Sequence, residues 1–232
     1  MDYTIIHPTD RNNGVRGKIS SPLTVTGYVP MHYGQSVRYE GPNERDFLQV
    51  IDFHPHIKAA WPQPIAFKLN GIPGKIQYTP DYLVEFSPGS GRPAMRPMLV
   101  EVKRRIDLTQ ARDELLPGFK AAVDYCRREG WRFRIVTDTW LKRPRSMNAR
   151  FLWSYRRDNY GPDIADVLMA NLRKVGRSPA IGLVESCYQE FEDQMLALGV
   201  VWHMLATRKI ETNPNLPLNN NSIIWEARNG AS

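Results

Sequence analysis

The sequence predicts an α/β fold, in which a mixed β-sheet flanked by helices is followed by a small helical domain. The first observation is the order of patterns, a helix, a run of strand-like segments, another helix and another strand. The second is the change to an almost entirely helical pattern after about residue 158. With 42% hydrophobic residues and six tryptophans in 232 residues, the chain can bury a core. The expected domains are residues 1–158 and 159–232.

The first elements are short. Residues 1–40 are rich in Gly, Pro, Ser and Tyr, which predicts short strands with turns at Gly27 and Gly34. A helix is expected to begin at Glu44 with Asn43 as its cap. Apolar residues recur there at helical spacing, which predicts that one face of this helix is buried.

Three strand-like segments follow the helix, PIAFKLNG, KIQYTPDYLVEF and PMLVEVKRR. Asn70-Gly71 predicts a turn between the first two. Residues 109–129 are helical in pattern and are expected to break at Pro117-Gly118, and WRFRIVT predicts a further strand.

The segment after residue 158 is helical and nearly neutral, with Gly176 and Gly199 as expected helix ends. Its polar tail carries one apolar patch, Ile223-Ile224-Trp225. We therefore expect a second, small helical domain there.

The positive charge is concentrated in one part of the chain. Residues 104–157 contain 14 Lys and Arg against 6 Asp and Glu, whereas the remainder contains 17 against 18. Such a block is the usual electrostatic signature of nucleic-acid binding, and it is also what a solvated, partly ion-paired helix surface looks like. Charge alone leaves both interpretations open.

The composition argues against several classes of protein. No stretch approaches the roughly 20 apolar residues of a membrane span, and the N-terminus has no apolar segment typical of a signal peptide. We therefore expect a soluble protein. Cys126 and Cys187 stand alone, so neither a structural zinc site nor a disulfide is expected.

The strongest chemical signal is Pro80-Asp81, followed twenty residues later by Glu101-Val102-Lys103. Glu101 and Lys103 are two apart on an expected strand and project from the same face. Pro80 suits the start of a strand, and Asp81 comes close to Glu101 if the two strands pair. The simpler interpretation of Glu101 and Lys103 is the outward face of an amphipathic strand, and the preceding Pro80-Asp81 favours function.

Phosphodiester hydrolysis needs such groups. Two carboxylates can hold Mg²⁺, which prefers oxygen ligands, and an adjacent lysine can orient water or stabilise charge. Glu44 lies at the edge of the apolar arc of its helix and would need a partner such as a metal, although a first-turn Glu is also favoured by the helix dipole. Gln63 could support the site.

Four arginines of the basic block are candidates for contact with the DNA backbone. Arg104 and Arg105 directly follow the strand with the expected catalytic residues. The other two are Arg127 and Arg128.

Together these residues resemble the TnsA family, the endonuclease subunit of heteromeric transposases. The resemblance begins near Gly14-Val15-Arg16-Gly17 and ends near LATRKIETNPNLPLNNNSII. Between them it includes NERDFLQVIDFHP, Gln63-Pro64, IQYTPDYLVEF, LVEVKRR and FRIVTD. It therefore covers most of the chain in the family's order.

The resemblance implies a restriction-endonuclease-like fold and a PD-(D/E)xK active site. Its catalytic residues would be Glu44, Asp81, Glu101 and Lys103, with the three acids binding one or two Mg²⁺ or Mn²⁺ ions. Some relatives have Gln where this chain has Glu101. The implied activity is hydrolysis at the 5′ ends of a transposon during cut-and-paste transposition, while a DDE recombinase subunit cuts and joins the 3′ ends.

The resemblance also implies partners. The C-terminal domain would be winged-helix-like and would dock to an ATPase regulator and to the recombinase, and the substrate would be double-stranded DNA of transposon ends. No membrane is involved, and such a protein is expected in the bacterial cytosol, at the nucleoid when it acts. Two alternatives remain, a free-standing restriction-like nuclease or junction resolvase, and a catalytically inactive DNA-binding adaptor.

Overall fold

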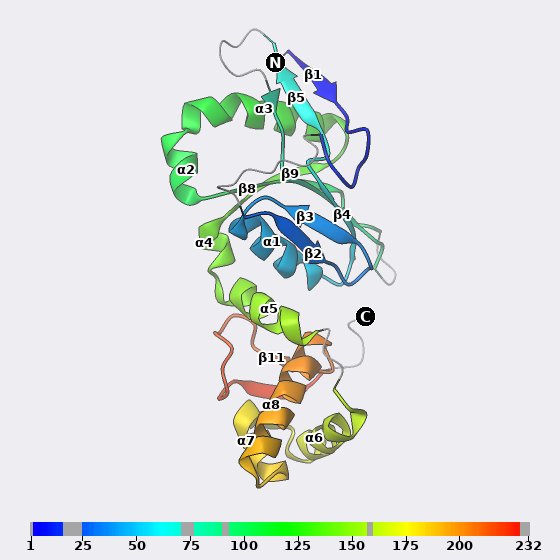
Figure 1. Ribbon diagram of the computed structural model, residues 1–232, viewed down its shortest axis with the longest axis vertical. Coiled ribbons are helices and arrows are strands. Elements are labelled where there is room, and N and C mark those ends of the chain that lie inside the picture. Colours follow the sequence, from blue (N-terminus) through cyan, green and yellow to red (C-terminus); the bar gives the residue numbers. More distant parts are fainter. Residues whose placement is uncertain (1, 16–24, 71–76, 90–92, 157–159, 228–232) are drawn as a thin grey trace. The chain divides into compact units, whose positions relative to one another are not determined.

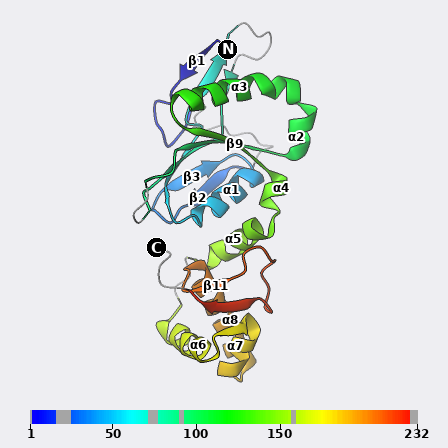
Figure 2. The same cartoon turned by 180° about the vertical axis from the view of Figure 1, so that it is seen from behind.

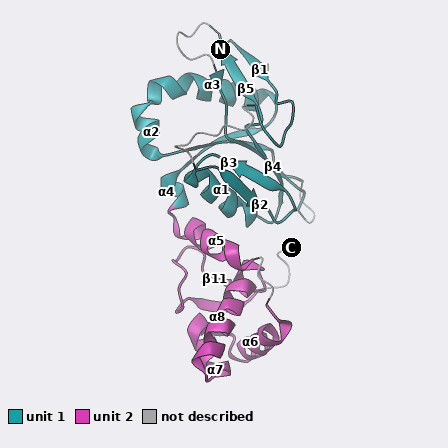
Figure 3. Cartoon of the chain, in the orientation of Figure 1, with its two compact units in different colours: residues 1–141 teal, residues 142–232 magenta. Residues whose placement is uncertain are grey.

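The computed structural model describes residues 2–15, 25–70, 77–89, 93–156 and 160–227. The chain divides into two compact units, Met1–Leu141 and Lys142–Ser232 (Figure 3). Among the described residues, no helix combines the length and the apolar character needed to cross a bilayer.

The first unit contains both strands and helices. Its strands are β1 (Tyr3–Ile6), β2 (Gly27–Pro30), β3 (Ser36–Tyr39), β4 (Ile57–Pro62), β5 (Ala66–Leu69), β6 (Gln77–Tyr78), β7 (Tyr82–Phe86), β8 (Met98–Lys103) and β9 (Arg132–Thr137). Its helices are α1 (Pro42–Asp52), α2 (Arg105–Gln110), α3 (Arg112–Arg128) and α4 (Asp138–Leu141).

The central sheet of this unit has the strand order β4-β7-β8-β9. β7 pairs antiparallel with β4 and with β8, whereas β8 pairs parallel with β9. Parallel strands need a crossover connection, and α2 with α3 supplies it. The mixed sheet with helices confirms the predicted fold class.

Helices α1 and α3 lie on opposite sides of this sheet (Figures 1 and 2). On the α1 side, the ring of Phe47 packs on that of Tyr82 at 5.7 Å between centroids. On the α3 side, Leu83 and Leu99 join a buried cluster with Tyr125 and other residues of α3. That cluster also includes residues of β5 and β6, from the sheet β1-β5-β6.

The strand-like segment KIQYTPDYLVEF divides between two sheets. Its first part contributes β6 to the sheet β1-β5-β6, and its second part contributes β7 to the central sheet. The chain changes sheets at Thr79–Asp81, because Pro80 cannot donate a ladder hydrogen bond. Asp81 therefore lies at the head of β7. The predicted turn at Asn70-Gly71 runs into residues 71–76, outside the described residues.

Helix α1 begins earlier than predicted. Its N-cap is Gly41, and Pro42 occupies the first turn, so Asn43 is not the cap. Pro is well suited there, because the missing N–H would have no partner in the helix. The shift places Glu44 within the first turn.

The break expected at Pro117-Gly118 was wrong, since α3 runs through both residues and the helices divide at Ala111. The face of α3 that includes Gly118, Ala121, Ala122 and Tyr125 is buried, and this burial outweighs the one backbone hydrogen bond that Pro117 cannot make. Gly118 lets the helix approach closely, because a Cβ there would lie 2.5 Å from Cγ of Tyr78.

The second unit contains α5 (Pro144–Tyr155), α6 (Pro162–Val175), β10 (Arg177–Pro179), α7 (Ala180–Cys187), α8 (Phe191–Ala206), β11 (Ile210–Thr212) and β12 (Ile223–Glu226). The strands form a sheet of order β10-β12-β11. The order helix, strand, two helices and two strands after α5 is that of a winged helix, as predicted. Gly176 ends α6, but Gly199 lies inside α8, where it faces the hydroxyl of Tyr160.

Helix α5 belongs to the second unit, so the two units divide before it and not at residue 158 as the sequence suggested. The ring of Phe151 lies 5.6 Å from that of Trp202 in α8, and Nδ1 of His203 lies 2.8 Å from the carbonyl of Tyr155. The side chain of Asn148 binds the backbone of residues 214–218. These contacts join α5 to the winged helix.

Candidate active site

The candidate catalytic residues come from three elements of the first unit. Glu44 lies in the first turn of α1, Asp81 directly precedes β7, and Glu101 and Lys103 lie near the end of β8. β7 and β8 pair antiparallel with Tyr82 opposite Val100, which brings Asp81 beside Glu101. The structure therefore brings together residues that are far apart in sequence.

The Asp81 side chain is fixed against β8. Its backbone N–H donates to the carbonyl of Val100 at 3.0 Å, and its Oδ2 accepts a hydrogen bond from the N–H of Val102 at 2.6 Å. Since Val102 separates Glu101 from Lys103, this bond holds the Asp81 carboxylate next to both.

Glu101 is buried, with 3% of its surface exposed. Its Oε2 accepts a hydrogen bond from the hydroxyl of Tyr78 at 2.9 Å, and its Oε1 lies 3.4 Å from Nζ of Lys103. The Lys103 side chain is 35% exposed, so its amine reaches the surface while it remains beside the carboxylate. This pair is not the solvated outer face of an amphipathic strand.

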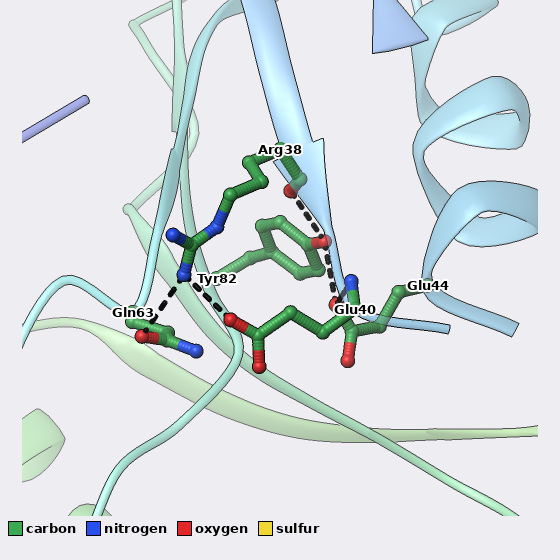
Figure 4. A network of polar contacts seen from close by, with 5 residues as sticks. All are labelled: Arg38, Glu40, Glu44, Gln63 and Tyr82. Atoms are coloured by element: carbon green, nitrogen blue, oxygen red, sulfur yellow. Dashed lines mark hydrogen bonds and ion pairs between the residues drawn. The ribbon is translucent and has the colours of Figure 1, made fainter. Parts of the chain in front are cut away.

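Glu44 is held from two sides. Its Oε2 accepts a hydrogen bond from the backbone N–H of Glu40 at 2.9 Å and lies 2.9 Å from the hydroxyl of Tyr82. The Tyr82 hydroxyl is also 2.9 Å from the carbonyl of Arg38, so its one proton serves either acceptor. Figure 4 shows this arrangement.

The carboxylates influence one another electrostatically. Burial raises the pKa of Asp81 well above its ordinary value, and the negative charges of Glu101 and Glu44 raise it further. The hydrogen bond from Val102 and the charge of Lys103 act in the opposite direction. Burial likewise raises the pKa of Glu44, and hydrogen bonds from Glu40 and Tyr82 oppose it. The neighbouring carboxyl groups therefore disfavour one another's ionisation.

These groups fit a hard divalent cation. No group of three His, Cys, Asp or Glu side chains in the described part of the chain is placed to hold a metal ion by itself. Mg²⁺ does not require such a cage, because it is commonly bound through one or two carboxylates, with waters and substrate phosphates completing its shell. Asp81 and Glu101 supply two adjacent carboxylates whose mutual repulsion a cation would relieve.

Gln63, expected to support the site, lies near it. Its backbone N–H donates to the carbonyl of Asp81 at 2.7 Å, and its side chain is buried. Its backbone has φ 43°, a conformation that residues other than glycine rarely adopt.

The four arginines predicted to contact DNA do not form one patch. Arg104 is paired with Asp107 through two hydrogen bonds, and Arg105 begins α2. Arg127 and Arg128 lie in the last turn of α3, where the Arg128 guanidinium contacts Tyr3 of β1. With 17 residues at about 1.5 Å rise each, α3 separates the two pairs by its whole length.

The sequence did not point to Tyr78, Tyr82, Arg38 or Glu40 as residues of the site. The two tyrosines flank Pro80-Asp81, and this spacing is the only local signal that the sequence offers for them. Arg38 and Glu40 lie at the end of β3 and beyond it, and only the fold brings them to the carboxylates.

The mixed sheet, with Asp81 at the head of one strand and Glu101 and Lys103 on its antiparallel neighbour, defines a domain of the restriction-endonuclease-like class. Residues 49–138 match the model of the TnsA-like endonuclease N terminal family. The match includes Asp81, Glu101 and Lys103, whereas Glu44 and the second unit lie outside it. A search of the curated proteins gave no match.

Proposed function

We propose that the chain is the Mg²⁺-dependent DNA endonuclease subunit of a heteromeric transposase, which hydrolyses phosphodiester bonds at the 5′ ends of the transposon. The observation that carries this proposal is the meeting of Asp81, Glu101 and Lys103 within the segment that matches the TnsA-like endonuclease family. Two carboxylates and a lysine amine, the protein groups that the proposed hydrolysis uses, lie close together there.

In the proposed mechanism each side chain has a separate task. Asp81 and Glu101 would hold the cation, with Glu44 at the edge of the site, and Mn²⁺ would fit the same oxygen ligands. When bound, the cation supplies polarisation of the scissile phosphate. The amine of Lys103 orients the attacking water or stabilises the charge that develops on the phosphate. Tyr78 and Tyr82 hold the carboxylates of Glu101 and Glu44 in place.

Double-stranded DNA is the proposed substrate, and part of its binding surface is assigned to α5. Lys142 and Arg143 directly precede this helix, Arg145 lies in its first turn, and all three are exposed. Residues 142–156 contain five Lys and Arg and no Asp or Glu. This charge suits the phosphate backbone, to which most sequence-independent contacts are made.

The winged helix is the proposed docking site for the ATPase regulator and the DDE recombinase. Phe191, Met195 and Leu196 of α8 are exposed, with Phe191 71% exposed. Glu192 and Asp193 lie in the first turn of the same helix. Acidic residues repel phosphate, and exposed apolar side chains favour a protein partner, so this surface supports protein docking.

Strand-specific cleavage of transposon-end DNA tests the proposal. Wild type, Asp81→Ala and Glu85→Ala are each incubated with Mg²⁺, with and without the recombinase and the ATPase. Glu85 is a matched control, because it lies on β7 but binds the Trp61 indole and Arg11 instead of the site. We expect cutting near the 5′ ends that requires Asp81 and the partners and is retained by Glu85→Ala.

The other outcomes identify the alternatives. Cleavage by the isolated protein that is lost in Asp81→Ala would indicate a free-standing nuclease or junction resolvase. DNA binding without any cutting that depends on Asp81 would indicate an inactive adaptor.

A further inference from the structure

A buried arginine lies beside the candidate active site. Arg38, in β3, is 6% exposed, and its Nη2 lies 2.5 Å from Oε1 of Glu40 and 3.5 Å from Oε1 of Gln63 (Figure 4). A charged group is buried only where partners replace its water. The guanidinium is therefore directed into the protein toward these two side chains.

Each of these partners is hydrogen-bonded to a candidate metal-binding residue. The backbone N–H of Glu40 donates to Oε2 of Glu44 at 2.9 Å. The backbone N–H of Gln63 donates to the carbonyl of Asp81 at 2.7 Å. Arg38 thus connects a residue of α1 with the residue at the head of β7, two elements that do not follow one another in the sequence.

The backbone of Arg38 closes the network from the other side. Its carbonyl lies 2.9 Å from the hydroxyl of Tyr82, which is also 2.9 Å from Oε2 of Glu44. Tyr82 directly follows Asp81 in the chain. The side chain and the carbonyl of Arg38 are therefore connected by separate routes to the Glu44 carboxylate and to the backbone of Asp81.

Gln63 needs to be held in its observed conformation. Its φ of 43° is unfavourable for a residue with a Cβ, and such strain persists where the surrounding structure enforces it. The N–H of Val15 donates to the Gln63 carbonyl at 3.0 Å, and Gly14 packs so closely that a Cβ there would lie 2.8 Å from Cβ of Gln63. Arg38 contacts the side chain of this strained residue, which in turn fixes the Asp81 backbone.

We propose that Arg38 is a positioning residue that sets the placement of Glu44 relative to Asp81, acting through Glu40 and Gln63. This inference rests on the proposed function, in which these carboxylates bind the divalent cation. Arg38 does not contact the DNA, because its guanidinium is buried and points toward Glu40 and Gln63.

The test uses the full chain and Mn²⁺ alone as the probe. Mn²⁺ affinity is measured by calorimetry for wild type, Arg38→Met, Arg38→Lys and the double variant Arg38→Met/Glu40→Gln. Arg38→Lys keeps the charge without the planar fork of the guanidinium, and the double variant removes both charges of the pair. Arg11→Met is the control, because Arg11 also pairs with a glutamate of the first unit, at 3.6 Å from Glu85.

We expect Arg38→Met to weaken Mn²⁺ binding by about 10–100-fold, the range found for residues that orient metal ligands. In cleavage assays kcat should fall while the KM for DNA stays unchanged. The double variant should be more thermally stable than Arg38→Met but should still bind Mn²⁺ more weakly than wild type. Arg38→Lys, which retains the fold, should also bind Mn²⁺ more weakly than wild type.

The following outcomes overturn the proposal. Wild-type Mn²⁺ affinity in Arg38→Lys or in the double variant would show that Arg38 only compensates the charge of Glu40. A raised KM with unchanged kcat would make Arg38 a DNA contact. In both cases a loss of Mn²⁺ binding in Asp81→Ala would leave the proposed function standing. Absence of Mn²⁺ binding in wild type would overturn both.

Discussion

Adding one methyl group to helix α3 tests how the candidate site is supported. A Cβ at Gly118 would lie 2.5 Å from Cγ and 2.8 Å from Cβ of Tyr78, whereas carbon atoms in contact are separated by about 3.5–4.0 Å. These atoms are close to the Tyr78 backbone and cannot rotate away. In Gly118→Ala either the helix or the tyrosine must therefore move by about 1 Å to restore contact distance.

Two opposing effects determine the stability of this variant. Overpacking of a core lowers the free energy of unfolding by about 1–3 kcal/mol, and replacing Gly by Ala inside a helix raises it by about 1 kcal/mol. We expect a net loss of about 1 kcal/mol, which lowers Tm by roughly 2–4 °C in a protein of this size. The fold should therefore persist.

The effect on cleavage should be larger. The Tyr78 hydroxyl donates to Glu101 at 2.9 Å, so displacement of the ring moves the donor that holds this carboxylate. A misplacement of about 1 Å at a catalytic group can cost about 10²-fold in rate. We expect Gly118→Ala to retain its fold and to cleave DNA about 10–100-fold more slowly, because the displacement is about 1 Å.

The assay compares cleavage rate and Tm in Gly118→Ala, Tyr78→Phe and the double variant. Because both changes act through one hydroxyl, their effects on rate should not add. Gly161→Ala is the control, since a Cβ there meets nothing within 4 Å. Wild-type cleavage by Gly118→Ala would refute the assignment of Tyr78 as the support of Glu101.

Three further changes test the electrostatics, the DNA surface and the backbone. Because burial and Glu101 raise the pKa of Asp81 in the folded state, that state binds more protons than the unfolded chain, and stability falls as pH rises through the folded pKa. Asp81→Asn should therefore have a higher Tm than wild type in EDTA, and this difference in Tm should be larger at pH 7.5 than at pH 4.5. The same difference in Tm at both pH values would contradict this. Arg143→Gln/Arg145→Gln should weaken DNA binding and reduce its salt slope by about 2, and an unchanged slope in a titration with salt would remove α5 from the DNA surface. Gly14 has φ 72°, and a Cβ there would lie 2.7 Å from a backbone oxygen. Gly14→Ala should therefore lower Tm by several degrees, roughly 2–4 °C per kcal/mol of strain, and a wild-type Tm in calorimetry would refute this prediction.

The central part of the candidate site could be predicted because its signals are local. The alternation of side chains along a strand is enough to place Glu101 and Lys103 on one face. Pro80 marks the start of a strand, and strand pairing then brings Asp81 to them. These steps use only covalent geometry and the preferences of proline.

The supporting residues could not be predicted in this way. Arg38 and Gln63 meet because two segments distant in sequence approach one another, and no periodicity in either segment records this contact. Strand β4 was also missed, since its run Ile57–Pro62 has no alternation of polar and apolar residues. Its burial pattern reflects contacts on both faces, which a single segment cannot reveal.

The helix boundaries that were wrong have a common cause. Pro117 and Gly199 are residues that usually interrupt or end a helix, and the predicted breaks followed from these local preferences. In the structure each lies in a helix whose apolar face is buried, and tertiary packing outweighs the local preference.

The position of β8 has a consequence for synthesis of the chain. The four candidate catalytic residues all lie within the first 103 residues, but β8 is an inner strand held between β7 and β9, and β9 ends only at Thr137. During translation the N-terminal part emerges first, and until β9 is available β8 lacks one of its two neighbours. The mutual repulsion of the carboxylates opposes their assembly before that point. A ribosome-bound chain that stops short of β9 should therefore lack a formed site, so that any nuclease activity begins only when the whole first unit has been made.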